Sequence, residues 1–195
     1  MGILIREINA SNLHYVNRCD GTFTVDARLV LRLEGGELRY EVVPLLPYPK
    51  KYPIEERDYP AYINHPEQTV FLAFLDGRFA GQIILRKDWN RYASVEDITV
   101  DAGYRRRGVG TELISRAIRW AKDNHLPGIR LETQDNNVGA CRFYESLGFR
   151  LGGFDRYLYK GIPGIEDEVA LYWYFLFASD EDQGSPPGVK SGGAS

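Results

Sequence analysis

The segment 100–111 constrains the fold more than any other part of this 195-residue chain. An apolar strand pattern ends at Val100, and the three arginines Arg105–Arg107 follow it within a few residues. Gly108 and Gly110 then precede an apolar stripe with the 3.6-residue spacing of a helix. Glycines let a ligand approach the backbone closely, and a helix N-terminus attracts phosphate. The order of strand, glycine turn and helix therefore predicts a mixed α and β domain with a phosphate-binding turn.

Two common phosphate-binding motifs do not match this turn. A Walker A loop would need lysine where Val109 stands, and a dinucleotide fingerprint would need glycine at Leu113. The pattern that fits is Arg/Gln-x-x-Gly-x-Gly/Ala, which Arg105, Gly108 and Gly110 satisfy. The turn therefore indicates a phosphate-containing ligand that differs from the ligands of those two motifs.

Hydrophobic periodicity predicts one mixed sheet for residues 1–179, taken as a single domain, with a disordered tail at 180–195. Segment 44–66 holds six prolines, and we expect it to be mostly loop. We expect helices at 12–20, Gly110–Asn124 and Asn137–Leu147. We expect strands at 3–8, Val25–Leu33, Glu37–Val43, Val70–Leu75, Phe79–Leu85, Ser94–Val100, Ile129–Thr133, Phe149–Tyr159 and Glu168–Phe177.

A second block lies about thirty residues after the glycine turn. It runs from Asn137 through Ala140, Phe143 and Tyr144 to Gly148-Phe149. Together with the turn, this block resembles the GNAT superfamily of acetyl-CoA-dependent N-acetyltransferases. The resemblance implies an α+β GNAT-like fold with a central, mostly antiparallel sheet flanked by helices. It also implies that the sheet splays between the strands at 94–100 and 129–133.

The resemblance further implies which residues hold acetyl-CoA, and no metal is expected. The strand Ile98, Thr99 and Val100 would pair with the pantetheine arm, and Asn137 would contact that arm. Tyr144 would lie near the sulfur. The residues implied for the pyrophosphate are Arg105, Arg106, Arg107, Gly108, Val109, Gly110 and Thr111.

Acetyl transfer to an amine needs a base for the ammonium proton and an acid for the leaving thiolate. Tyr144 is the expected acid, because tyrosine and thiol have similar pKa values. Glu96 and Asp97 are the candidates for the base, and strand alternation predicts that only one of them faces the site. We favour Glu96, while a solvated surface carboxylate is an open alternative. Cys141 is expected to pack in a helix rather than act as a nucleophile.

Acidic clusters and aromatic residues suggest a small cationic amine as the acceptor. Trp89-Asn90, Gly152-Gly153-Phe154-Asp155 and Tyr48-Pro49-Lys50-Lys51-Tyr52 are similar to segments of the streptothricin acetyltransferases. Those enzymes inactivate streptothricin-type antibiotics by acetylating an amine of the β-lysine chain. The resemblance makes Trp89, Asp155, Tyr48, Tyr52 and Glu96 candidate substrate contacts.

Other functions stay open at this point. They are a GNAT enzyme for a polyamine, an aminoglycoside or a protein amine, and a non-catalytic acyl-CoA-binding module. The net charge of −3 argues against a nucleic-acid binder. The sequence contains no run of about 18 apolar residues, so we expect no membrane span. It has two distant cysteines and no apolar leader, and we therefore expect a cytoplasmic protein. The sequence leaves the oligomeric state open, with a homodimer among the alternatives.

Overall fold

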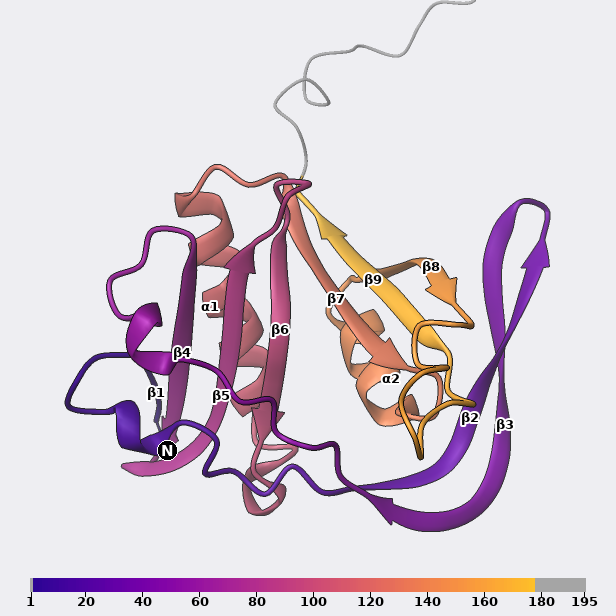
Figure 1. The fold of residues 1–195 in the computed structure, drawn as a ribbon, viewed down its shortest axis with the longest axis horizontal. Coiled ribbons are helices and arrows are strands. Elements are labelled where there is room, and N and C mark those ends of the chain that lie inside the picture. The colour runs from indigo at the N-terminus through magenta and orange to yellow at the C-terminus, as the bar shows by residue number, and fades with distance from the viewer. Residues whose placement is uncertain (1, 178–195) are drawn as a thin grey trace, which may run out of the picture.

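The computed structural model describes residues 2–177. It contains strands β1 (Ile3–Glu7), β4 (Gln68–Leu75), β5 (Arg78–Lys87), β6 (Ala93–Val100), β7 (Gly128–Gln134), β8 (Arg150–Asp155) and β9 (Ala170–Leu176). They form one seven-stranded sheet in the order β1-β4-β5-β6-β7-β9-β8 (Figure 1). The β6–β7 pair is parallel, and the other neighbouring strands in this described sheet are antiparallel. The expected mixed, mostly antiparallel GNAT-like sheet is confirmed.

Two α-helices, α1 (Val109–Asp123) and α2 (Val138–Ser146), pack into one hydrophobic core on the same face of the sheet (Figure 1). The apolar stripe of α1 is buried there through Leu113, Ile114, Ala117 and Ala121. The opposite face carries a smaller core under the short 3-10 helices η1 (Leu13–Tyr15) and η2 (Tyr59–Tyr62). None of the helices in the described part of the chain is long and apolar enough to cross a membrane.

A long hairpin of β2 (Phe23–Glu34) and β3 (Glu37–Lys50) forms a separate two-stranded sheet beyond α2 (Figure 1). The Tyr40 hydroxyl donates to Glu145 Oε2 of α2 at 2.7 Å, and the Leu29 amide donates to the Asp135 carbonyl at 2.8 Å. The hairpin ends in a largely buried ion pair between Lys50 and Glu168. These contacts hold the hairpin against the half of the sheet that contains β7, β8 and β9.

The main sheet opens between its two parallel strands. β6 and β7 pair only from Ala93–Val95 to Ile129–Leu131. A β-bulge lies at Glu96, because Leu85 faces Val95 while the preceding Ile84 faces Asp97. From Glu96 onward β6 keeps its β5 partner and has no β7 partner, so the expected splay is confirmed.

Three local expectations differ from the structure. The 12–20 helix is wrong, because only Leu13–Tyr15 is helical and forms a single 3-10 turn. The 44–66 loop is wrong over its first seven residues, since β3 continues through three prolines to Lys50. Each strand of a two-stranded sheet has a free edge, so prolines do not break a ladder there.

The third difference is at 149–159, where the strand ends at Asp155. The Asp155 carboxylate accepts from the Tyr157 and Leu158 amides at 2.7 and 3.1 Å, which turns the chain away. The expected tail at 180–195 lies outside the described residues.

Candidate active site

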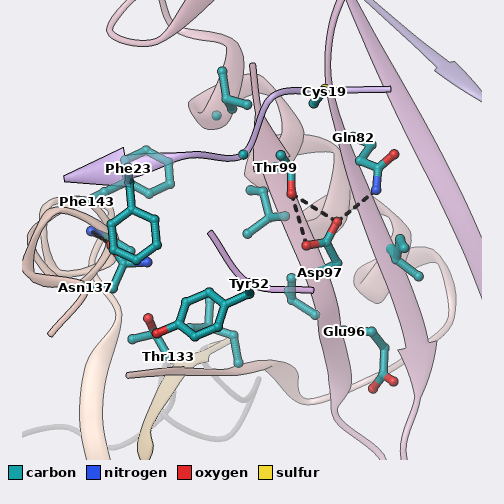
Figure 2. Close-up of a pocket in the computed structure, with 18 of the residues that line it drawn as sticks. Cys19, Phe23, Tyr52, Gln82, Glu96, Asp97, Thr99, Thr133, Asn137 and Phe143 are labelled. Carbon is teal, nitrogen blue, oxygen red and sulfur yellow. Dashed lines mark hydrogen bonds between the residues drawn. The ribbon is translucent and has the colours of Figure 1, made fainter. Parts of the chain in front are cut away.

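A cavity of about 1110 Å³ lies where β6 and β7 separate (Figure 2). One end is lined by the glycine turn before α1, and the other by acidic and aromatic side chains of β6, β7 and β9. The coil 51–58, here called the strap, crosses the front of the sheet after β3 (Figure 1). Its residues Tyr52, Ile54, Glu55 and Arg57 line the cavity. The cavity therefore joins a phosphate-type turn to an acidic chamber.

The glycine turn has an open, left-handed backbone. Arg106 and Gly108 have φ angles of 59° and 85°. Gly108 caps α1, so the amides of the first helical turn have no partner within the helix. Arg105 holds the turn to β6 because its Nε donates to the Val100 carbonyl at 3.2 Å. Free amides, a positive helix end and arginine side chains suit a pyrophosphate group.

The structure brings together the residues expected to bind acetyl-CoA, with one exception. The cavity lining includes Ile98, Thr99, Val100, Arg105, Arg106, Gly108, Val109, Gly110, Thr111, Asn137 and Tyr144. Arg107 is not part of the lining, and its guanidinium lies 5.8 Å from the centre of the Tyr104 ring. Asn137 also caps α2, because its Oδ1 accepts from the Ala140 amide at 3.3 Å. The unpaired edge of Ile98–Val100 suits backbone pairing with an extended ligand.

Tyr144 of α2 is one of the residues that line the cavity. Its side chain is buried in the core of α2 and contacts the rings of Phe143 and Phe149. Its hydroxyl has no hydrogen-bond partner among the described residues. Burial, followed by the charge of Asp97, raises the pKa of Tyr144. The hydroxyl therefore stays protonated and available as a proton donor.

Glu96 and Asp97 both line the cavity, so the expectation that only one of them faces the site is wrong. The bulge at Glu96 breaks the alternation on which that expectation depended. Glu96 is paired with Arg57 at 3.2 Å and with Arg86 at 3.4 Å. Asp97 has only neutral partners, and burial raises its pKa.

Sequence reasoning missed the partners of Asp97. Gln82 Nε2 donates to Asp97 Oδ2 at 2.9 Å, and Thr99 Oγ1 donates to the same carboxylate at 3.1 Å (Figure 2). The same Gln82 amide donates to Asn17 Oδ1 at 2.8 Å, and the Asn17 backbone amide donates to Gln82 Oε1 at 2.7 Å. A buried glutamine within the apolar run Ala80–Leu85 was the available signal.

The acidic chamber is formed by Tyr52, Glu132 and Tyr172. The Tyr159 hydroxyl donates a hydrogen bond to Glu132 Oε1, and Gln134 Nε2 donates to that hydroxyl at 3.0 Å. Glu132 keeps contact with solvent, and partial desolvation of its carboxylate raises its pKa. Tyr52 is a predicted substrate residue that the structure places here, whereas Glu132 and Tyr172 were missed.

Three other predicted substrate residues do not reach the cavity. Trp89 is 88% exposed in the β5–β6 turn, at the end of the sheet opposite the glycine turn (Figure 1). The Asp155 carboxylate is used by the turn after β8. Tyr48 lines a separate small cavity with Arg28 and Asp135. None of the three lines the cavity in this structure, and their role as substrate contacts stays a prediction.

The comparisons with known proteins agree with this geometry. The acetyltransferase (GNAT) family model matches residues 38–149. Streptothricin acetyltransferase A of Bacillus subtilis (strain 168) is 38% identical over 175 residues, which are 89% of this chain and 100% of the relative. Streptothricin acetyltransferase of Escherichia coli is 41% identical over 149 residues, which are 76% of this chain and 81% of the relative.

Two solved structures extend the comparison. A Bacillus anthracis str. Ames protein assigned as a streptothricin acetyltransferase, in complex with acetyl coenzyme A, is 47% identical with a TM-score of 0.84. The match covers 90% of this chain and 100% of that one. Nourseothricin acetyltransferase is 28% identical with a TM-score of 0.76, covering 90% and 99% of the two chains. This chain therefore belongs to the GNAT family and is an acetyl-coenzyme A-dependent N-acetyltransferase.

Proposed function

We propose that the enzyme acetylates an amine of the β-lysine chain of streptothricin-type antibiotics and so gives resistance to them. The observation that carries the proposal is the single cavity that joins the glycine turn to the acidic chamber. A chamber that combines the Glu132 carboxylate with tyrosine rings suits a small cationic acceptor. The identities of 38% and 41% to two streptothricin acetyltransferases support the same substrate.

We propose that the donor lies along the edge of β6. The free amides of the α1 N-terminus and the side chains of Arg105 and Arg106 would hold the pyrophosphate. The unpaired backbone of Ile98–Val100 and the amide group of Asn137 would hold the pantetheine arm. This arrangement would direct the thioester toward Tyr144 at the splay.

In the proposed reaction the acceptor nitrogen attacks the thioester carbonyl, and the carbon–sulfur bond breaks directly. A carboxylate on β6 takes the ammonium proton, directly or through water, and the Tyr144 hydroxyl gives a proton to the leaving thiolate. Backbone amides of β6 at the splay stabilise the developing oxyanion. We favour Asp97 over Glu96 as the base, because two arginines occupy the Glu96 carboxylate while Asp97 has only neutral partners.

The test is an acetylation assay with acetyl-CoA and streptothricin F, which measures thiol release and the mass of the product. We expect turnover with one acetyl group on the β-lysine chain. A polyamine, an aminoglycoside and a peptide with a free N-terminus serve as comparison acceptors. Absence of turnover with streptothricin at high enzyme concentration, or a higher kcat/KM with a comparison acceptor, would overturn the proposal.

We further propose that the enzyme acts in the cytoplasm. Its cysteines, Cys19 and Cys141, are free and buried, as expected in a reducing compartment. Fractionation of cells that express the full chain, followed by the same assay, tests this location.

A further inference from the structure

The carboxylates that line the cavity fall into two groups. Glu55 and Glu96 both pair with Arg57, and Glu96 also pairs with Arg86. Asp97 and Glu132 have no cation within 4.0 Å in the described part of the chain. Arg130, the neighbour of Glu132 on the same face of β7, is paired with Asp88 at 2.8 Å. Neither carboxylate therefore has an ion-pair partner of its own, and Arg57 acts on Asp97 and Arg130 on Glu132 only from farther away.

The two carboxylates without an ion pair lie on opposite sides of the splay. Asp97 follows the last paired residue of β6 by two positions, and Glu132 follows the last paired residue of β7 by one. The charge of Asp97 acts on Tyr144, whereas the charge of Glu132 acts on Tyr52, Tyr159 and Tyr172. Asp97 thus acts on Tyr144, in the part of the cavity that we call the transfer centre. Glu132 lies in the acidic chamber with Tyr52 and Tyr172.

The surroundings of Glu132 suit an ammonium group. Tyr159 fixes Oε1 by its hydrogen bond, while Oε2 has no partner among the described residues. The rings of Tyr52 and Tyr172 line the same chamber. A similar arrangement exists within the chain, where the Lys50 ammonium pairs with the Glu168 carboxylate and lies 4.6 Å from the centre of the Tyr52 ring.

We propose that Glu132 binds the second, non-reacting ammonium of a diamine acceptor and thereby makes the enzyme selective for diamines over monoamines. The inference rests on the proposed function and deepens it, because β-lysine carries two amines. One amine would lose its proton at the transfer centre, while Glu132 holds the other. The Glu132 side chain is exposed and lines the cavity, so an ammonium can reach its carboxylate and place an opposite charge beside it.

The experiment compares three acceptors and three forms of the full-length enzyme. The acceptors are 3,6-diaminohexanamide, which has both β-lysine amines, and 3-aminohexanamide and 6-aminohexanamide, which each lack one. The enzymes are wild type, Glu132→Gln and Glu55→Gln. Glu55→Gln is the matched control, because it removes a cavity carboxylate that is already paired with Arg57. Thermal unfolding and acetyl-CoA binding verify that each variant is folded.

For wild type we expect kcat/KM to be roughly 10- to 100-fold higher with the diamine than with the better monoamine, the usual effect of one charged hydrogen bond. Glu132→Gln should lower kcat/KM for the diamine alone, so that most of the diamine-to-monoamine ratio is lost. Glu55→Gln should keep the ratio of wild type. Glu132→Asp, which retains the charge, should restore part of the ratio if Glu132→Gln folds poorly.

Three results would overturn the inference. One is a wild-type ratio near one, and another is an equal loss on all three acceptors in Glu132→Gln. The latter would mean that Glu132 only anchors Tyr159. The third is an equal loss of the ratio in Glu55→Gln. Streptothricin F in the same assay separates the two proposals, since its turnover by wild type tests the proposed function whatever Glu132→Gln does.

Discussion

The bulge at Glu96 decides how the acidic residues of β6 are used. One extra residue on a strand shifts the following side chains relative to strict alternation. Glu96 is thereby brought to two arginines, and Asp97 to Gln82 and Thr99. Two adjacent carboxylates thus line one cavity in different electrostatic surroundings. Such separation is common where one carboxylate acts as a base and its neighbour has a structural role.

Asp97→Asn should lower kcat/KM by about 10²- to 10⁴-fold at neutral pH, the usual range for losing a general base. A base must be deprotonated to act, and burial raises the pKa of Asp97. Wild-type kcat/KM should therefore fall as the pH drops through this raised pKa, and the acidic limb should be missing in Asp97→Asn. The measurement is a pH series of kcat/KM. If Glu96→Gln loses the limb and Asp97→Asn retains it, Glu96 is the base instead.

Tyr144→Phe should lower kcat by about 10²-fold or more with little change in the KM for acetyl-CoA. The ring contacts with Phe143 and Phe149 remain, so the variant should stay folded, and only the unpartnered hydroxyl is lost. Steady-state kinetics with thermal unfolding measure both effects. Tyr40→Phe is the control, because it removes a hydroxyl bonded to Glu145 outside the cavity. Unchanged turnover in Tyr144→Phe would contradict the acid role.

At the scale of the elements, the glycine turn before α1 depends on a left-handed backbone and is also the proposed pyrophosphate site. Gly108→Ala forces a side chain into a φ of 85°, which costs about 1–2 kcal/mol in the left-handed region. We expect a lower Tm and a several-fold higher KM for acetyl-CoA, because the turn would have to shift. Gly161→Ala, where a Cβ meets nothing within 4 Å, should change neither quantity. Equal KM values for both variants would show that the turn does not position the donor.

Elements with strong local signals were predictable from the sequence. Asp76-Gly77 forms the expected two-residue turn, with φ angles of 50° and 80° at its two residues. The start of α1 is within one residue of the expected position. The extension of β3 to Lys50 was not predictable, because its prolines are tolerated only through the pairing with β2. Tertiary pairing overrides local preference there.

At the scale of the whole molecule, the two ends of the cavity differ in how far the sequence could predict them. The donor end comes from two short continuous segments, so motif spacing identifies it. The acceptor end is assembled from residues far apart in the chain, such as Tyr52, Glu132 and Tyr172. No spacing relates these residues, because only the path of the strap and the pairing of β7 with β9 bring them together.

The splay also predicts how the molecule responds to its donor. Its two sheet halves share only three paired positions, Ala93–Val95 with Ile129–Leu131. If acetyl-CoA pairs with the free edge of β6, amides of 96–100 should gain protection from hydrogen exchange, while those of the paired 93–95 change little. The Tm should rise as well, by an amount that corresponds to about 2.7 kcal/mol at 100 times Kd. Hydrogen exchange by mass spectrometry with and without acetyl-CoA measures the local effect. Equal protection of 93–95 and 96–100 would indicate general tightening of the fold and would contradict donor pairing along β6.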